Sequence, residues 1–194
     1  AKVDIDIIGG EEEAAIIAAT DLQSYIKEDK TYLYVDVGGG STEFTVIHYG
    51  KTVVSRSFKI GTVRLLNDIV KKETWLELEN WIKTSTKGYD VLDLIGSGGN
   101  INKIFKISGK AMGKPLTYFY LTSYYNKLQT YSYDERITEL ELNPDRADVI
   151  IPATRIYLSA MKWSGAKDIY VPKIGLSDGI IKSVYFKTVS SIDL

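Results

Sequence analysis

The fold of this chain is constrained most by two short apolar runs, each of which leads directly into a glycine-rich segment. Residues 32–37 are too apolar to have one face in water and lead into the glycines of "YVDVGGGSTEF", while residues 92–95 lead into Gly96–Gly99. Strands buried on both faces are typical of sheets that helices cover on both sides. Glycine is rare inside strands because it brings no side chain to pack and loses much backbone entropy on folding. The two runs therefore predict a covered sheet in which two strands end in loops with a special task.

The order of the expected elements indicates an α/β fold of the ribonuclease-H-like type. From residue 32 on, hydrophobic periodicity predicts three hairpin-connected strands in a mixed sheet, then helix, strand and helix, which is the βββαβα order of that fold. Further helices are expected in the C-terminal half, where Pro152 should kink or delimit one of them because proline lacks a backbone donor. The sequence contains no repeat and no flexible linker, so residues 1–194 are expected to form a single domain. The expected strands are 3–8, 32–37, 44–48, 52–58, 91–95 and 168–172, and the expected helices are 11–29, 62–70, 74–85, 101–107, 121–131, 133–140, 146–163 and 177–186.

The composition excludes several classes of function. The 194 residues include no cysteine and a single histidine, His48, which rules out disulfides, thiolate chemistry and a His-rich metal site. The net charge is −1, so we expect no nucleic-acid partner. No apolar run approaches the roughly 20 residues of a membrane span, and the first residues do not resemble a signal peptide. We therefore expect a cytoplasmic protein without a membrane partner, and the start without Met in a strand-like run suggests a fragment of a longer chain.

Charge is unevenly distributed along the sequence. Residues 1–30 are acidic and residues 51–72 are basic. Two interpretations stay open: the segments are solvated faces that offset each other, or the basic segment faces a polyanion beside the first glycine loop.

The glycine segments themselves suit a bound phosphate. Backbone without Cβ atoms can approach an anion closely and turn several N–H donors toward it. Ser41 adds a hydroxyl at the rim of the first loop, and Gly96–Gly99 opens a helix, whose N-terminus is another anion site. The GxxxxGK[ST] pattern of a P-loop is absent, and a strand follows the first loop. A glycine-rich hairpin can be purely structural, but two such loops in one βββαβα unit favour phosphate binding.

The carboxylates near these loops have both structural and functional interpretations. Asp36 ends a buried strand, where it either hydrogen-bonds the amides of the turn or holds Mg²⁺ through water, since a buried carboxylate is costly to ionise without a partner. Residues 11–13, all glutamate, are either an acidic helix start or the source of a general base for attack on a terminal phosphoryl group. Glu43 either supports the site or is an exposed strand residue. His48 is expected to be structural.

Six motifs follow one another along the chain: "IIGGEEEA", "VDVGGGSTEF", "FKIGTVRL", "IGSGGN", "RADVIIPA" and "LSDG". Together they resemble the exopolyphosphatase/guanosine-pentaphosphate phosphohydrolase (Ppx/GppA) family of the actin-like ATPase superfamily. The resemblance implies two ribonuclease-H-like domains with phosphate bound in the cleft between them, and this chain matches the second, C-terminal one. The N-terminal domain of the same polypeptide is therefore an expected partner, and the family's habit suggests a homodimer.

The resemblance also implies a role for each matching residue. Glu13 takes the place of the catalytic glutamate, which acts on the attacking water. Asp36 takes that of the Mg²⁺-associated aspartate, and Glu43 is the carboxylate next to it, so Mg²⁺ is the implied cofactor. The implied substrates are inorganic polyphosphate and guanosine pentaphosphate, which lose their terminal phosphate by hydrolysis. The implied phosphate-binding residues are Gly38, Gly39, Gly40, Ser41, Gly96, Ser97, Gly98 and Gly99.

A few positions depart from the family pattern. Ala15 stands where the family has an arginine, and Lys182 lies in a divergent segment. The second loop reads Gly98-Gly99-Asn100 in place of Ser-Gly-Thr. Three hypotheses follow: a Mg²⁺-dependent exopolyphosphatase-like domain that is inactive without its N-terminal domain, a non-catalytic polyphosphate or nucleotide sensor, and, less favoured, a phosphotransferase of the same superfamily.

Overall fold

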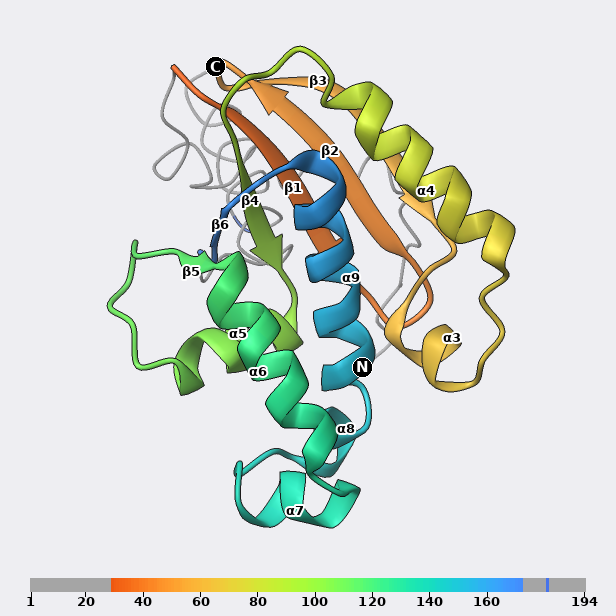
Figure 1. Ribbon diagram of the computed structural model, residues 1–194, viewed down its shortest axis with the longest axis vertical. Coiled ribbons are helices and arrows are strands. Elements are labelled where there is room, and N and C mark those ends of the chain that lie inside the picture. The colour runs from red at the N-terminus through yellow and green to blue at the C-terminus, as the bar shows by residue number, and fades with distance from the viewer. Residues whose placement is uncertain (1–28, 173–180, 182–194) are drawn as a thin grey trace, which may run out of the picture.

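Three strands at the start of the described chain form an antiparallel meander, which the rest of the sheet extends. The structure is a computed structural model and describes residues 29–172 and residue 181. The strands are β1 (Thr31–Val37), β2 (Thr42–His48), β3 (Lys51–Phe58), β4 (Leu92–Ser97), β5 (Leu116–Thr117) and β6 (Asp168–Tyr170). β4 pairs parallel with β1, and β6 pairs parallel with β4, while β5 runs antiparallel to β6. The order across the sheet is β3-β2-β1-β4-β6-β5 (Figure 1).

One long helix, α9 (Ile150–Ser164), lies across the middle of the sheet, and α4 (Lys72–Ser85) lies beside it (Figure 1). α9 belongs to the crossover between the parallel strands β4 and β6, a connection that needs a helix to return the chain to the same edge. The same crossover contains α5 (Gly99–Ile107), α6 (Tyr118–Thr130), α7 (Tyr133–Thr138) and α8 (Pro144–Ala147). α3 (Thr62–Leu66) follows β3, and α7 and α8 lie beyond the ends of the strands (Figure 1).

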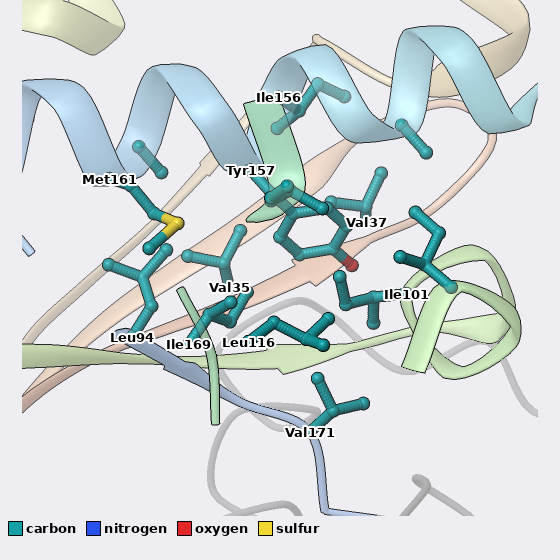
Figure 2. Packing of buried hydrophobic residues seen from close by; sticks show 14 of the residues in the cluster. Val35, Val37, Leu94, Ile101, Leu116, Ile156, Tyr157, Met161, Ile169 and Val171 are labelled. Carbon is teal, nitrogen blue, oxygen red and sulfur yellow. The ribbon is translucent and has the colours of Figure 1, made fainter. Parts of the chain in front are cut away.

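Side chains from the sheet and from α9 form the main core. Val35 on β1 and Leu94 on β4 are fully buried and point toward α9, where Ile156 and Tyr157 meet them (Figure 2). Successive side chains of a strand alternate between its two faces, so Tyr32 and Tyr34 on β1 point away from α9. The second buried cluster lies there and consists of Tyr32, Tyr34, Ile47 and Ile95. β1 is therefore buried on both faces, as its apolar sequence predicts.

The ribonuclease-H-like α/β fold with its mixed βββαβα sheet is confirmed, and the differences lie in the boundaries. β4 continues through Gly96 and Ser97, so half of the expected second loop is strand. The expected helix 146–163 is divided into α8 and α9, and Pro152 is the third residue of α9, where an N–H has no helical partner to lose. The two-residue β5 was not expected, since so short a strand leaves no periodic signal.

The expected strand 3–8 lies outside the described residues, as do the expected helices 11–29 and 177–186 apart from residues 29 and 181. The helix expected over 62–70 ends earlier, at Leu66. Among the residues that the structure describes, no helix combines the length and the apolar character needed to cross a membrane.

The core should respond sharply to truncation of Leu94. This side chain is fully buried in the middle of β4, whereas Val91, just before the strand, is 65% exposed. We expect Leu94→Ala to lower the free energy of unfolding by about 2–5 kcal/mol, because it leaves a cavity. Val91→Ala should change it by about 0.5 kcal/mol or less. Urea unfolding of both variants checks this, and equal losses would contradict the described position of β4.

Candidate functional site

The carbonyl groups of the first glycine loop accept hydrogen bonds from a helix, while two of its amides have no backbone acceptor in the described part of the chain. The Gly38 N–H donates to the Ser41 carbonyl at 3.0 Å, which closes the turn after β1. The carbonyls of Gly38 and Gly39 accept from the first amides of α3, those of Thr62 and Val63, at 3.0 and 2.9 Å. Within the described residues, the amides of Gly39 and Gly40 donate to no backbone carbonyl. The loop thus caps α3 and keeps N–H donors available for an anion.

The glycines around this loop are needed for different reasons. A Cβ at Gly61 would overlap the carbonyl of Gly39, so the close approach of α3 to the loop requires glycine there. A Cβ added at Gly40 would have no atom of the described residues within 4 Å, and the φ angle of Gly40 is not positive. Packing within the described chain therefore does not demand glycine at position 40. A ligand that approaches the backbone closely would demand it.

The second glycine segment is part strand and part helix start. A Cβ at Gly96 would come within 2.8 Å of the Ile169 side chain, so core packing already accounts for that glycine. Gly98 precedes α5 with φ +114°, and a Cβ there would lie 3.1 Å from the Val37 carbonyl. The second loop therefore lies against the end of β1, where the first loop begins. The first amides of α5 point out of the helix, as at any helix N-terminus.

An arginine lies against each loop. The Arg64 Nε donates to the Gly40 carbonyl at 2.8 Å. The Arg146 guanidinium fills the place beside Gly99, where an added Cβ would be 2.5 Å from its Nη1. Arg56, in the same basic segment as Arg64, instead pairs with Glu77 on α4. The basic segment thus reaches the first loop through Arg64, while Arg146 comes from α8.

Sequence reasoning assigned no role to Arg146. The available signal was its place at the start of the motif "RADVIIPA", one of the six motifs that carry the family resemblance. Its guanidinium lies beside Gly99 and supplies a cation at the second loop. A planar guanidinium can donate two parallel hydrogen bonds to two oxygens of one phosphate group. Arg64 and Arg146 therefore provide one such group at each loop.

Polar side chains from four strands form a row across the end of the sheet. Asp36 is opposite Glu43 in the β1–β2 pairing and opposite Ser97 in the parallel β1–β4 pairing, and Glu43 is opposite Ser57 on β3. Residues that are paired across strands point to the same face. Glu43 Oε1 accepts from the hydroxyls of Ser41 and Ser57 at 2.7 and 2.8 Å. The row joins the predicted Asp36, Glu43, Ser41 and Ser97 and adds Ser57, which has no motif of its own.

Asp36 is the buried member of this row. Burial raises the pKa of its carboxyl, hydrogen bonds from the Ser97 and Tyr34 hydroxyls oppose that rise, and the neighbouring Glu43 carboxylate adds to it. The Tyr34 bond is 3.2 Å long. Two carboxylates that face each other across strands repel, and a hard cation with oxygen ligands relieves both the repulsion and the burial cost. Asp36 and Glu43 therefore offer donors of the type that Mg²⁺ prefers.

Tyr157 holds the second loop in place from the opposite side. Its hydroxyl donates to the carbonyl of Ser97, the last residue of β4. Figure 2 shows the ring extending from α9 past Val37, with the hydroxyl at the end nearer Ile101. Burial raises the pKa of Tyr157 well above its ordinary value, so the hydroxyl stays protonated and remains a donor. The long helix is thus tied directly to the strand end that carries the site.

Not every expected site residue can be placed. Glu13 lies outside the described residues, so its role stays a prediction. Asn100, at the start of α5, is buried with no partner for its Oδ1 within the described residues. His48 lies at the opposite end of β2 from the loops, and its Nδ1 is 2.8 Å from the Thr31 hydroxyl. That contact is in keeping with the structural interpretation of His48.

Comparison with known proteins decides the family. The Ppx/GppA phosphatase family matches residues 1–187, which is nearly all of the sequence. The chain belongs to the Ppx/GppA phosphatase family. Its fold is that of the solved family member from Aquifex aeolicus, with a TM-score of 0.77 and 24% identity over 96% of this chain and 66% of that one.

Two further proteins are similar to this chain. An exopolyphosphatase from Cytophaga hutchinsonii superposes with a TM-score of 0.75 and 20% identity, covering 94% of this chain and 65% of that one. A bifunctional 3-dehydroquinate synthase/phosphatase from Fusobacterium nucleatum is 27% identical over 190 residues, which are 88% of this chain and 29% of that protein. The chain thus spans less than two thirds of the length of each of these three proteins.

The contrast between Gly40 and Gly61 gives a test of the loop. We expect Gly61→Ala to lower the free energy of unfolding by about 1–3 kcal/mol, because its Cβ overlaps backbone. Gly40→Ala should leave stability unchanged or slightly raised, since Ala restricts the unfolded chain. The same Gly40→Ala should lower phosphate release by the full-length protein about 100-fold, if its Cβ displaces the bound phosphate by about 1 Å. Undiminished phosphate release in a folded Gly40→Ala protein would argue against a nest at this loop.

The raised pKa of Asp36 gives a pH dependence with a definite sign. The folded chain binds this proton more tightly than the unfolded chain, whose aspartate titrates near its usual value of about 3.9. Ionised Asp36 therefore lowers stability above its folded-state pKa, and this cost disappears as the pH falls through that pKa. In metal-free buffer we expect Asp36→Asn to unfold at a higher temperature than wild type at pH 7, with a difference that shrinks toward pH 4. An Asn variant that is less stable at pH 7 would show that the neighbours stabilise the charge.

Proposed function

We propose that this chain is the C-terminal domain of a Mg²⁺-dependent phosphohydrolase that removes terminal phosphate from inorganic polyphosphate or guanosine pentaphosphate. The observation that carries the proposal is the meeting of the two glycine loops at one edge of the sheet, where a Cβ at Gly98 would lie 3.1 Å from the Val37 carbonyl and 3.7 Å from Asp36 Oδ1. The loops, the two arginines and the paired carboxylates all lie at this edge. Membership of a phosphatase family and similarity to an exopolyphosphatase support it.

Each group has a part in the proposed reaction. The free amides of the first loop and the start of α5 bind successive phosphate groups, and Arg64 and Arg146 neutralise their charge. Asp36, with Glu43 beside it, holds Mg²⁺, which when bound supplies positive charge at the phosphoryl oxygens. Glu13 orients the attacking water and accepts its proton. Ser97, Ser57 and Tyr157 act through these groups and position them.

The proposed site needs a second wall. The two loops bind one side of a phosphate chain, and the N-terminal domain of the same polypeptide supplies the other side. The domain on its own should therefore be inactive, and a homodimer of the full-length protein is compatible with this arrangement. If the full-length protein binds polyphosphate tightly but releases no phosphate at any Mg²⁺ concentration, the chain is a sensor rather than an enzyme.

Glu13 gives the decisive catalytic test. We expect Glu13→Ala to lower phosphate release from polyphosphate by about 100-fold or more, because a positioned general base contributes about that much. Binding of the substrate should be retained, since the loops, arginines and carboxylates that hold it are unchanged. Release of inorganic phosphate by the full-length protein with Mg²⁺ is the measurement. Glu139→Gln, an exposed glutamate at the end of α7, is the control and should release phosphate at the wild-type rate.

The same assay separates the substrates and the proposed roles. Parallel measurements with polyphosphate and with guanosine pentaphosphate show which one the protein prefers. Equal rates for wild type and Glu13→Ala would remove Glu13 from the mechanism.

A further inference from the structure

Lysines and exposed apolar side chains meet at the edge of the sheet that β5 forms (Figure 1). Residues 94–133 contain five lysines and no arginine, aspartate or glutamate. Within this stretch, the connection from α5 to β5 and the start of α6 expose three large apolar side chains, those of Met112, Tyr118 and Phe119. Phe119 is 80% exposed. Exposed apolar side chains that are grouped in this way indicate an interaction site.

The end of α9 adds lysines and a hollow to the same surface. The Tyr118 N–H donates to the Lys167 carbonyl at 2.8 Å, which joins the start of α6 to the segment after α9. A cavity of about 300 Å³ lies there, with the buried Met161 in its lining and the exposed Lys162 and Lys167 beside it. We call the following six residues the β5-edge surface: Met112, Lys114, Tyr118, Phe119, Lys162 and Lys167.

The connection that carries Met112 and Lys114 is tied back on itself. Lys110 Nζ donates to the Pro115 carbonyl at 2.7 Å, and the Lys114 N–H donates to the Ala111 carbonyl at 3.1 Å. Met112 is therefore a central residue of a tight turn and has no core to pack against. A turn that is already fixed loses less entropy when a partner binds it.

The lysines of the β5-edge surface are not neutralised within the described chain. None of the ion pairs between described residues includes Lys114, Lys162 or Lys167. β6 contributes one carboxylate, Asp168, which is half-buried opposite Thr117. Unpaired cations beside exposed apolar groups fit a partner that offers negative charge and apolar volume together.

We propose that the β5-edge surface binds an anionic lipid bilayer, with Met112 and Phe119 inserted at the level of the headgroups. The lysine ammonium groups gain from the negative surface potential of such a membrane, and their methylene stems pack along the apolar side chains. Protein segments that lie in the membrane interface combine lysine with phenylalanine in this way. The expectation of no membrane partner concerned a spanning segment, which this mode of binding does not need. The proposal does not depend on the proposed function.

The side chains favour a lipid surface over a nucleic acid. Proteins that bind nucleic acids use arginine for paired bonds to phosphate and aromatic rings on which bases stack. Residues 94–133 contain no arginine, and Met112 offers no ring. The ammonium group of lysine is a compact point charge, which suits a diffuse anionic surface.

The β5-edge surface is separate from the glycine loops. α5 begins at Gly99, and its nine residues rise roughly 13 Å before the connection to β5 starts. Across the sheet, β6 lies between β4 and β5. A protein bound to a membrane through this surface therefore keeps its glycine loops open to a ligand from solution.

Sedimentation of the full-length protein with lipid vesicles tests this proposal. We expect binding to vesicles of phosphatidylcholine with about one third phosphatidylglycerol, and binding about tenfold or more weaker to phosphatidylcholine alone. Binding should fall steeply when the salt concentration is raised from about 0.1 M to about 1 M, because salt screens the lysines. Equal binding to the two kinds of vesicle would overturn the proposal.

Two pairs of variants locate the surface that binds. Phe119→Ser should weaken binding to the anionic vesicles about tenfold, because it removes an inserted ring. Leu76→Ser, at a leucine on α4 that is 58% exposed, should leave binding unchanged. Lys114→Gln should weaken binding about fivefold, the share of one lysine near the membrane. Lys127→Gln, at an exposed lysine in the last turn of α6, should leave it unchanged.

All four substituted side chains are exposed, so each variant should unfold at the wild-type temperature. Equal losses of binding in the test variants and their controls would place the contact elsewhere and contradict the proposal. Titrations with polyphosphate and with single-stranded RNA examine the alternative partners. If either binds through Phe119 and Lys114 while the anionic vesicles do not, the surface serves a soluble polyanion and the lipid proposal is wrong.

Discussion

Parallel hydrogen bonding between β1 and β4 carries the ends of two buried strands to one edge of the sheet, and the two glycine loops meet there because of it. The pairing puts Asp36 opposite Ser97 and lets Gly98 touch the Val37 carbonyl. A slip of one residue would turn Val35 away from α9 and exchange the two faces of β1. Because both faces are buried, such a slip would place side chains of the wrong shape on each of them. Core packing, rather than the loops, therefore fixes where the loops meet.

The same edge contains groups that work against the stability of the domain. Burial raises the pKa of Asp36, Glu43 faces it across the pairing, and Asn100 Oδ1 is buried without a partner in the described chain. Strain of this kind persists where the surrounding structure over-determines it and is concentrated at functional sites. Here the surrounding structure is the double-sided core under β1 and the Tyr157 hydroxyl at the end of β4. The well-packed part of the described chain thus holds these unfavourable groups in fixed positions at the end of the sheet.

Sequence reasoning predicted the features with a local signal and missed those made by distant contacts. The apolar run of β1, Asp36 at its end and the glycines after it follow from neighbouring residues alone. Arg146 reaches Gly99 only because α8 folds back over the start of α5, and Ser57 joins the row only through the register of β3. Gly96 looked like part of a loop, yet Ile169 on β6 explains it, and β6 follows much later in the sequence. The sequence also predicted the helix break at Pro152, whereas the chain breaks between α8 and α9, before this proline. Proline is tolerated in the first turn of a helix, so Pro152 lies inside α9.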